Sequence, residues 1–127
     1  CMEAIGAPRF TEEEKAYARQ VAQAVGLPGV EGELDESILP VDGTIKKDNG
    51  SSDVADVSQI VPVVNINTAC YGRKTPNHSW AVTVQADKPA AHRGMLFAAK
   101  TLALMGTRLA TEPTLLAAVR AEFEQAE

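Results

Sequence analysis

The sequence predicts an α/β fold in which a small sheet packs on helices, in the order α-β-β-α-α. Three observations carry this prediction: a capped amphipathic segment near the start, two β-branched segments in the middle, and two apolar helical segments at the end. The chain has 127 residues, which is the length of one domain of ordinary size. A chain of this length buries roughly two-thirds of its surface on folding, which is enough for a real core.

The first predicted helix covers residues 11–25. Thr11 and Glu14 have the spacing of a capping box, and Gly26 and Pro28 provide the stop. An acidic first turn also suits the positive end of the helix dipole.

The middle of the chain predicts a long loop and two strands. Residues 27–52 are rich in Gly, Asp, Pro and Lys, with turn signals at 42–43 and 48–50, and show no helix or strand period. Residues 60–68 are β-branched, and alternation from Trp80 predicts a second strand over 80–85. A loop containing His78 separates the two strands.

The last third predicts two helices. The segment 89–109 is apolar over a broad face, so we expect other structure to cover it on more than one side. Pro113 then opens a final helix.

Composition excludes several classes of function. Twelve basic and seventeen acidic residues give a net charge of −5, which offers no basic field for nucleic acid or an anionic membrane. No stretch approaches the roughly 20 apolar residues of a membrane span.

The two cysteines, Cys1 and Cys70, form no disulfide framework or zinc knuckle, so we expect a reducing, cytoplasmic setting. Met2 follows Cys1, which suggests a piece of a longer protein.

The two histidines are the first candidates for chemistry. His78 lies in a loop before a predicted strand, where sites are often built; the alternative is a surface or capping residue. His92 lies in the first turns of a helix, where a packed or solvent-facing role is favoured.

A run of small residues over 50–58 holds two carboxylates. Asp53 and Asp56 share a face if this run is helical; the alternative is an Asp or Ser cap on a short helix. A triad of Ser51 or Ser52 with His78 and Asp53 is rejected, because no strand–nucleophile–helix elbow surrounds the serines.

Ligand spacing argues against a complete metal site in this chain. A catalytic zinc needs about three protein ligands and an open position. The sequence has no His-x-His, no His-Glu-x-x-His and no cysteine pair at ligand spacing. It can contribute one ligand to a shared site.

Four ordered segments resemble a known family. They are IGAPRFTEEEKAYAR at 5–19, GSSDVADVSQIVP at 50–62, INTACYGRKTPNHSW at 66–80 and AAHRGMLFAAKTLA at 90–103. In this order they resemble the C-terminal part of the aminobenzoyl-glutamate hydrolase B-subunit family, within the di-metal aminoacylase and carboxypeptidase superfamily.

The resemblance implies a fold and a site. Residues 1–127 would be the C-terminal part of a catalytic domain with a zinc-peptidase-like fold, without the lid domain through which family members dimerise. Apolar surface that the rest of the domain would cover would be exposed in this piece, so a homo-oligomer is expected. His78 would be a metal ligand, and Asp53 would lie near the substrate. His92 matches a recurring family histidine whose role stays open.

The resemblance also implies an activity for the intact parent. Two divalent ions, zinc or manganese, would activate a water that hydrolyses a small-molecule amide of the aminobenzoyl-glutamate, N-acyl amino acid or dipeptide type. The general base and the other ligands would lie upstream, so this piece alone would have no catalytic residue, hold no metal and be inactive. The alternative is a non-catalytic module that binds a ligand or a protein and shares the fold.

Overall fold

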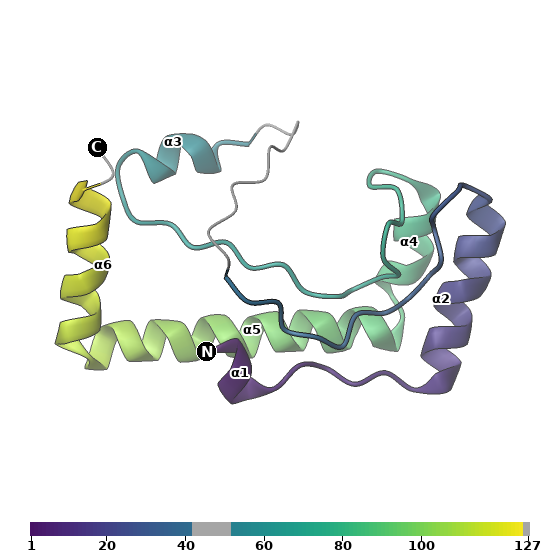
Figure 1. The fold of residues 1–127 in the computed structure, drawn as a ribbon, viewed down its shortest axis with the longest axis horizontal. Coiled ribbons are helices and arrows are strands. Elements are labelled where there is room, and N and C mark those ends of the chain that lie inside the picture. The colour runs from purple at the N-terminus through teal and green to yellow at the C-terminus, as the bar shows by residue number, and fades with distance from the viewer. Residues whose placement is uncertain (42–51, 126–127) are drawn as a thin grey trace. The chain divides into compact units, whose positions relative to one another are not determined.

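The computed structural model describes residues 1–41 and 52–125, and every regular element in these ranges is an α-helix (Figure 1). The predicted α/β fold with a small sheet is therefore wrong for the described chain. The helices are α1 (Met2–Ile5), α2 (Glu12–Val25), α3 (Val54–Ser58), α4 (Trp80–Ala86), α5 (Pro89–Thr111) and α6 (Pro113–Gln125).

The segment predicted as the first strand, 60–68, is irregular after Val61 and mostly exposed. In the described part of the chain, no backbone hydrogen bond joins residues 62–69 to another segment. A strand needs a neighbouring strand to pair its N–H and C=O groups. Local β propensity alone therefore does not make this segment a strand.

The segment predicted as the second strand is helix α4. Its buried residues, Ala81 and Gln85, are four positions apart, which is a helical spacing. The alternating apolar residues that suggested a strand include Trp80 and Val84, which are 54% and 36% exposed. The alternation therefore does not mark the buried face.

Helix α2 confirms the predicted capping box. The backbone N–H of Glu14 donates to Thr11 Oγ1 at 3.2 Å, and the N–H of Thr11 donates to Glu14 Oε2 at 2.6 Å. Gly26 ends the helix with a left-handed φ of 65°. Helices α5 and α6 begin at Pro89 and Pro113 as predicted.

The chain divides into two compact units. The first unit contains Cys1–Ile38 and Asn67–Leu102, and the second contains Leu39–Ile66 and Ala103–Glu127. In the first unit, helices α2 and α4 contact each other. Its core consists of Phe10, Ala18, Leu34 and Ala90, with Ala69 packed against them.

Close backbone contacts hold the first unit together. A Cβ at Gly32 would overlap the Ala18 carbonyl on α2, and a Cβ at Gly72 would lie 2.8 Å from Gly32 Cα. Likewise, a Cβ at Gly94 on α5 would overlap the carbonyl oxygen of Ala69. These glycines let four backbone segments approach closely.

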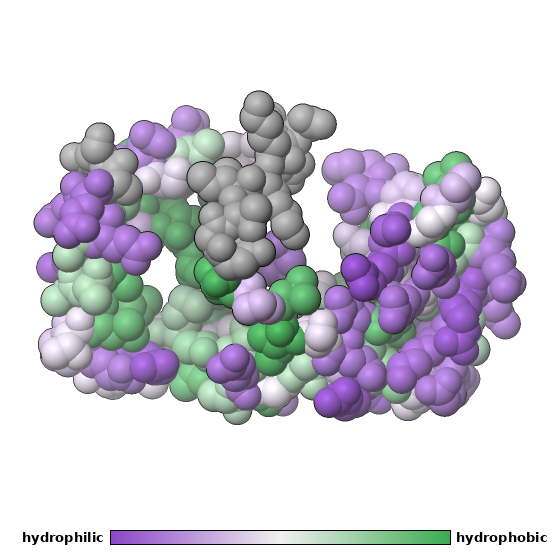
Figure 2. Space-filling view, viewed as in Figure 1, coloured by the Kyte–Doolittle hydropathy of each residue, from purple (hydrophilic) through white to green (hydrophobic). Residues whose placement is uncertain are grey.

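The second unit has little buried surface. None of the residues of α3 or α6 is buried, and Arg108 forms a two-pronged ion pair with Glu112, at 2.8 and 3.0 Å. Figure 2 shows apolar residues, in green, at the surface of the viewed face. Among the described residues of this unit, the large exposed apolar residues are Leu39, Val41, Val54, Val57, Ile60, Val61, Val63, Val64 and Leu116.

Among the described residues, no helix has both the length and the apolar character needed to cross a membrane. The two cysteines, Cys1 and Cys70, are free.

Candidate functional site

The loop that carries His78 is anchored to helix α4 by a buried glutamine. Gln85 is 4% exposed. Its Oε1 accepts the N–H of Gly72 at 3.1 Å, and its Nε2 donates to the carbonyl of Ala81 at 2.8 Å. A buried amide that makes both bonds fixes the start of the loop on the helix.

Hydrogen bonds also connect residues within the loop and join the loop to the segment near Gly32. The hydroxyl of Thr75, a buried residue, donates to the Gly72 carbonyl at 2.6 Å. The backbone N–H of Arg73 donates to the carbonyl of Glu33 at 2.7 Å. The loop that precedes α4 therefore has a defined conformation.

His78 is exposed and has a left-handed backbone, with φ 57°. This region is uncommon for a residue with a Cβ and is often found at functional sites. Hydrogen bonds flank it on both sides. The Tyr71 hydroxyl donates to Asn77 Oδ1 at 3.0 Å, and the Ser79 hydroxyl donates to the Pro76 carbonyl at 2.6 Å.

His78 lines an open groove of about 660 Å³. This volume lies within the range of small-molecule sites. Its lining combines an imidazole with the exposed indole of Trp80 and with hydroxyl and amide groups, so it suits a small molecule with an apolar ring and polar substituents. The lining residues are Tyr71, Asn77, His78, Ser79, Trp80, Val82 and Thr83.

The described residues do not form a complete metal site. An imidazole nitrogen is a common ligand of zinc and manganese, so His78 fits such an ion chemically. However, no group of three or more His, Cys, Asp or Glu side chains that could hold a metal occurs within residues 1–41 and 52–125.

Asp53, the predicted substrate-binding residue, occupies the N-cap position of α3 and is exposed. It belongs to the second unit, whereas His78 belongs to the first. The Asp53 side chain makes no capping hydrogen bond; Ser52 Oγ accepts the N–H of Val54 instead, at 3.3 Å. Asp53 thus occupies the cap position without a side-chain cap, and Ser52, one residue earlier, makes a local hydrogen bond. Residues 42–51, with their predicted turns and Ser51, lie outside the described residues.

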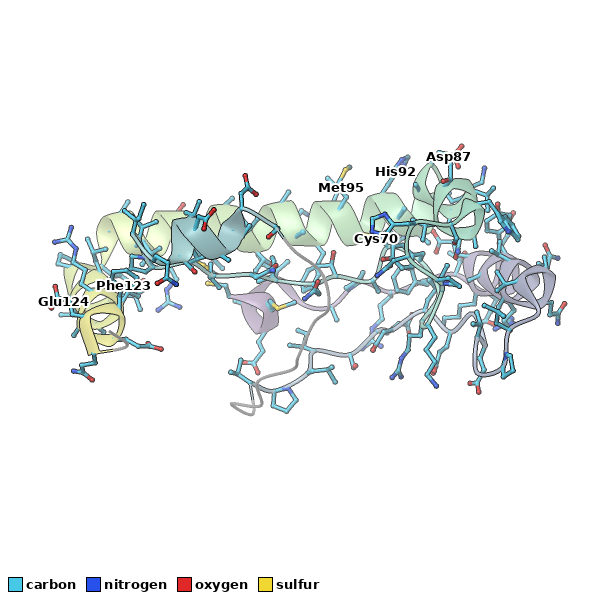
Figure 3. The ribbon with its side chains drawn as sticks, turned by 90° about the horizontal axis from the view of Figure 1, so that it is seen from above. Cys70, Asp87, His92, Met95, Phe123 and Glu124 are labelled. Atoms are coloured by element: carbon cyan, nitrogen blue, oxygen red, sulfur yellow. The ribbon has the colours of Figure 1, made fainter. Side chains whose placement is uncertain are left out.

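His92 is exposed on α5 and projects from the same side of the helix as Met95 (Figure 3). The solvent-facing alternative for this histidine is therefore confirmed. It is absent from the lining of the His78 groove.

A second groove, of about 700 Å³, has charged walls that the sequence did not indicate. Lys15 Nζ lies 3.4 Å from both Glu12 Oε1 and Glu36 Oε1. The N–H of Phe10 donates to Glu36 at 2.7 Å and, together with Lys15, lowers the pKa of that carboxyl. Because Lys15 and Glu36 in its wall are already paired with each other, this groove is a weaker candidate for ligand binding than the His78 groove.

The first unit thus presents the exposed imidazole of His78 beside the exposed indole of Trp80 in one open groove. The sequence is similar to the B-subunit of p-aminobenzoyl-glutamate hydrolase from Escherichia coli strain K12, with 29% identity over 143 residues. The match covers 94% of this chain and 30% of the relative's length. It supports a relationship to an amidohydrolase family. No protein-family model and no solved structure matches this chain.

Proposed function

We propose that this chain is the C-terminal part of the catalytic domain of a longer metal-dependent amidohydrolase. Its substrate would be an amide linked to an amino acid, of the aminobenzoyl-glutamate, N-acyl amino acid or dipeptide type. The similarity to the E. coli hydrolase over 94% of this chain supports the proposal. The relative's remaining length leaves room for the ligands and the general base that the described residues do not supply.

The observation that carries the proposal is the position of His78. It lies on a loop anchored by Gln85, has a left-handed backbone, and lines a groove with the exposed ring of Trp80. In the proposed enzyme, His78 is one ligand of a pair of zinc or manganese ions, and the groove holds the apolar part of the substrate. Asp53 contacts the substrate.

The proposal extends to the setting of the enzyme. The longer protein is a homo-oligomer of the cytoplasm, and residues 1–127 belong to one catalytic domain. The 127-residue chain alone is inactive and binds no metal pair, because about three protein ligands are needed per catalytic zinc and the described residues contain no group of three candidate ligands.

The test compares the two histidines of this sequence in the longer protein. Release of p-aminobenzoate from p-aminobenzoyl-glutamate is measured for the wild type, His78→Ala and His92→Ala, with and without a chelator. We expect His78→Ala to reduce activity at least about 100-fold, since losing even an outer partner of a ligand costs up to that much. His92→Ala is the comparison variant, and we expect it to lose less activity than His78→Ala because His92 does not line the groove.

Two results would contradict the proposal. One is wild-type activity in His78→Ala. The other is a natural protein whose intact mass is 13.5 kDa, the mass of this chain.

A second candidate is a non-catalytic module that binds a protein or a small ligand. The exposed apolar side chains of the second unit favour it, because such a surface is typical of an interaction site. This candidate predicts a natural protein of 13.5 kDa without hydrolase activity. The mass measurement therefore separates the two candidates.

A further inference from the structure

The conformation of His78 needs support from its surroundings. A left-handed backbone is unfavourable for a residue with a Cβ, because the Cβ approaches the following carbonyl oxygen. Such residues persist where neighbouring contacts hold them. Lys74, in the same loop, also has a left-handed backbone, with φ 59°.

The support on one side of His78 comes from Tyr71. Gly72, the next residue, is bound through its N–H to buried Gln85 at 3.1 Å. The half-buried Tyr71 is thereby held at the anchored end of the loop. From there its hydroxyl reaches six residues along the chain to Asn77 Oδ1, at 3.0 Å.

The support on the other side is local. Ser79 Oγ donates to the carbonyl of Pro76 at 2.6 Å, which closes the turn over residues 76–79. This local hydrogen bond fixes the conformation of the turn but not its orientation relative to the rest of the loop. Thr75, just before the turn, is hydrogen-bonded to Gly72, and the Tyr71–Asn77 bond is the side-chain contact that joins a residue inside the turn to the anchored end of the loop.

We infer that Tyr71 is a positioning residue for His78: by binding Asn77, it keeps His78 left-handed and its imidazole at the groove. The use of that imidazole rests on the proposed function, whereas the conformational effect does not. Tyr71 itself also lines the groove, so its aromatic ring must be kept when its hydroxyl is tested.

The test uses the 127-residue chain and the variant Tyr71→Phe, which removes the hydroxyl and keeps the ring. NMR measures the intraresidue HN–Hα NOE of His78, which is strong when φ is positive. Losing one hydrogen bond should reduce the ratio of left-handed to other conformers about fivefold. Lys74 is the internal reference and should keep its strong NOE.

Tyr17→Phe is the matched control. It removes a hydroxyl that donates to the Val84 carbonyl at 2.9 Å in the same unit. We expect no change at His78. Two single variants of the acceptor residue give a further comparison. Asn77→Asp keeps an acceptor for the Tyr71 hydroxyl and should keep the strong NOE at position 78, whereas Asn77→Leu should lose it.

An unchanged His78 NOE in Tyr71→Phe would overturn the inference. So would equal losses at His78 and Lys74, because the tyrosine would then support the loop as a whole.

The outcomes separate this inference from the proposed function. In the longer protein, Tyr71→Phe should also weaken Zn²⁺ binding about 10-fold by equilibrium dialysis. If His78→Ala left hydrolysis intact, the proposed function would fail while the NOE result stood. If His78→Ala abolished hydrolysis while Tyr71→Phe left the NOE unchanged, the positioning role would fail alone.

Discussion

Glu14 joins two helices through one carboxylate. Its Oε2 accepts the N–H of Thr11 at the start of α2, and its Oε1 accepts from Arg93 Nε of α5 at 2.9 Å. The side chain is 8% exposed. Burial raises its pKa, but the Thr11 N–H and the Arg93 guanidinium lower it by more, so the pKa lies below its ordinary value of 4.5.

This arrangement makes stability depend on pH. A carboxyl with a lowered folded pKa contributes its full stability above the unfolded pKa, near 4.5, and loses it as the pH falls through the folded pKa. Glu14→Gln should therefore flatten the decline in unfolding free energy below pH 4.5. At pH 7 it should cost about 1 kcal/mol, because the half-exposed Arg93 is partly screened by solvent.

Urea denaturation at several pH values between about 3 and 7 measures both effects. Glu13→Gln, in the same helical turn, is the control for removing one negative charge. Parallel pH profiles for Glu14→Gln and the wild type would show that the carboxylate does not stabilise the fold.

At the scale of elements, helix α5 contains two glycines in opposite surroundings. A Cβ at Gly94 would overlap the Ala69 carbonyl and lie 2.8 Å from Cys70 Sγ, whereas a Cβ at Gly106 would meet nothing within 4 Å. Two of the segments that resemble the hydrolase family, 66–80 and 90–103, therefore contact each other in the structure. Gly94 has a packing role, because it lets the backbone near Cys70 lie against helix α5.

Replacing Gly94 and Gly106 by alanine should change the free energy of unfolding in opposite directions. Gly94→Ala should destabilise the chain by about 1–3 kcal/mol through overpacking. Gly106→Ala should stabilise it by up to about 1 kcal/mol, because alanine is the better helix former in open space. Urea denaturation of both variants tests this pair, and a shared sign would contradict the packing role of Gly94.

Sequence patterns predicted α2, α5 and α6 because their signals are local. A capping box, a proline at the first helical position and a 3.6-residue apolar period all act within one element. For α4 the local pattern was misleading. The helix at this position makes a contact with a distant part of the sequence, because buried Gln85 accepts the backbone N–H of Gly72.

At the scale of the whole molecule, the two units differ in burial. Helix α2 has 14 residues, three of them buried, and a capping box; α6 has 13 residues and none buried. Helices of this length are marginal in water without tertiary packing. Stability should therefore be uneven along the chain.

Hydrogen exchange should reveal this difference. We expect protection factors in α6 at least about tenfold lower than in α2, equal to about 1.4 kcal/mol. Exchange followed by NMR at single amides makes the comparison, and the two helices serve as each other's control. Equal protection would mean that α6 is stabilised by something other than its own burial.

The candidate site was predictable in part. Two histidines in 127 residues, one of them in a loop bounded by Pro76 and a predicted element, singled out His78. The rings of Tyr71 and Trp80 carried a weaker signal, as aromatic residues on either side of that loop. Their placement around one groove depends on α4 being a helix, so it could not be read from the alternation at Trp80.

By itself, the sequence determined where three helices begin, which loop carries His78, and that the net charge is −5. These features depend on caps, prolines and charge, whose effects extend over a few residues. The tertiary structure decided that 60–68 is not a strand in the described chain, that 80–86 is a helix, and which residues line the groove. The reason is that strand pairing, burial and the Tyr71–Asn77 and Gln85–Gly72 bonds join residues that no local pattern connects.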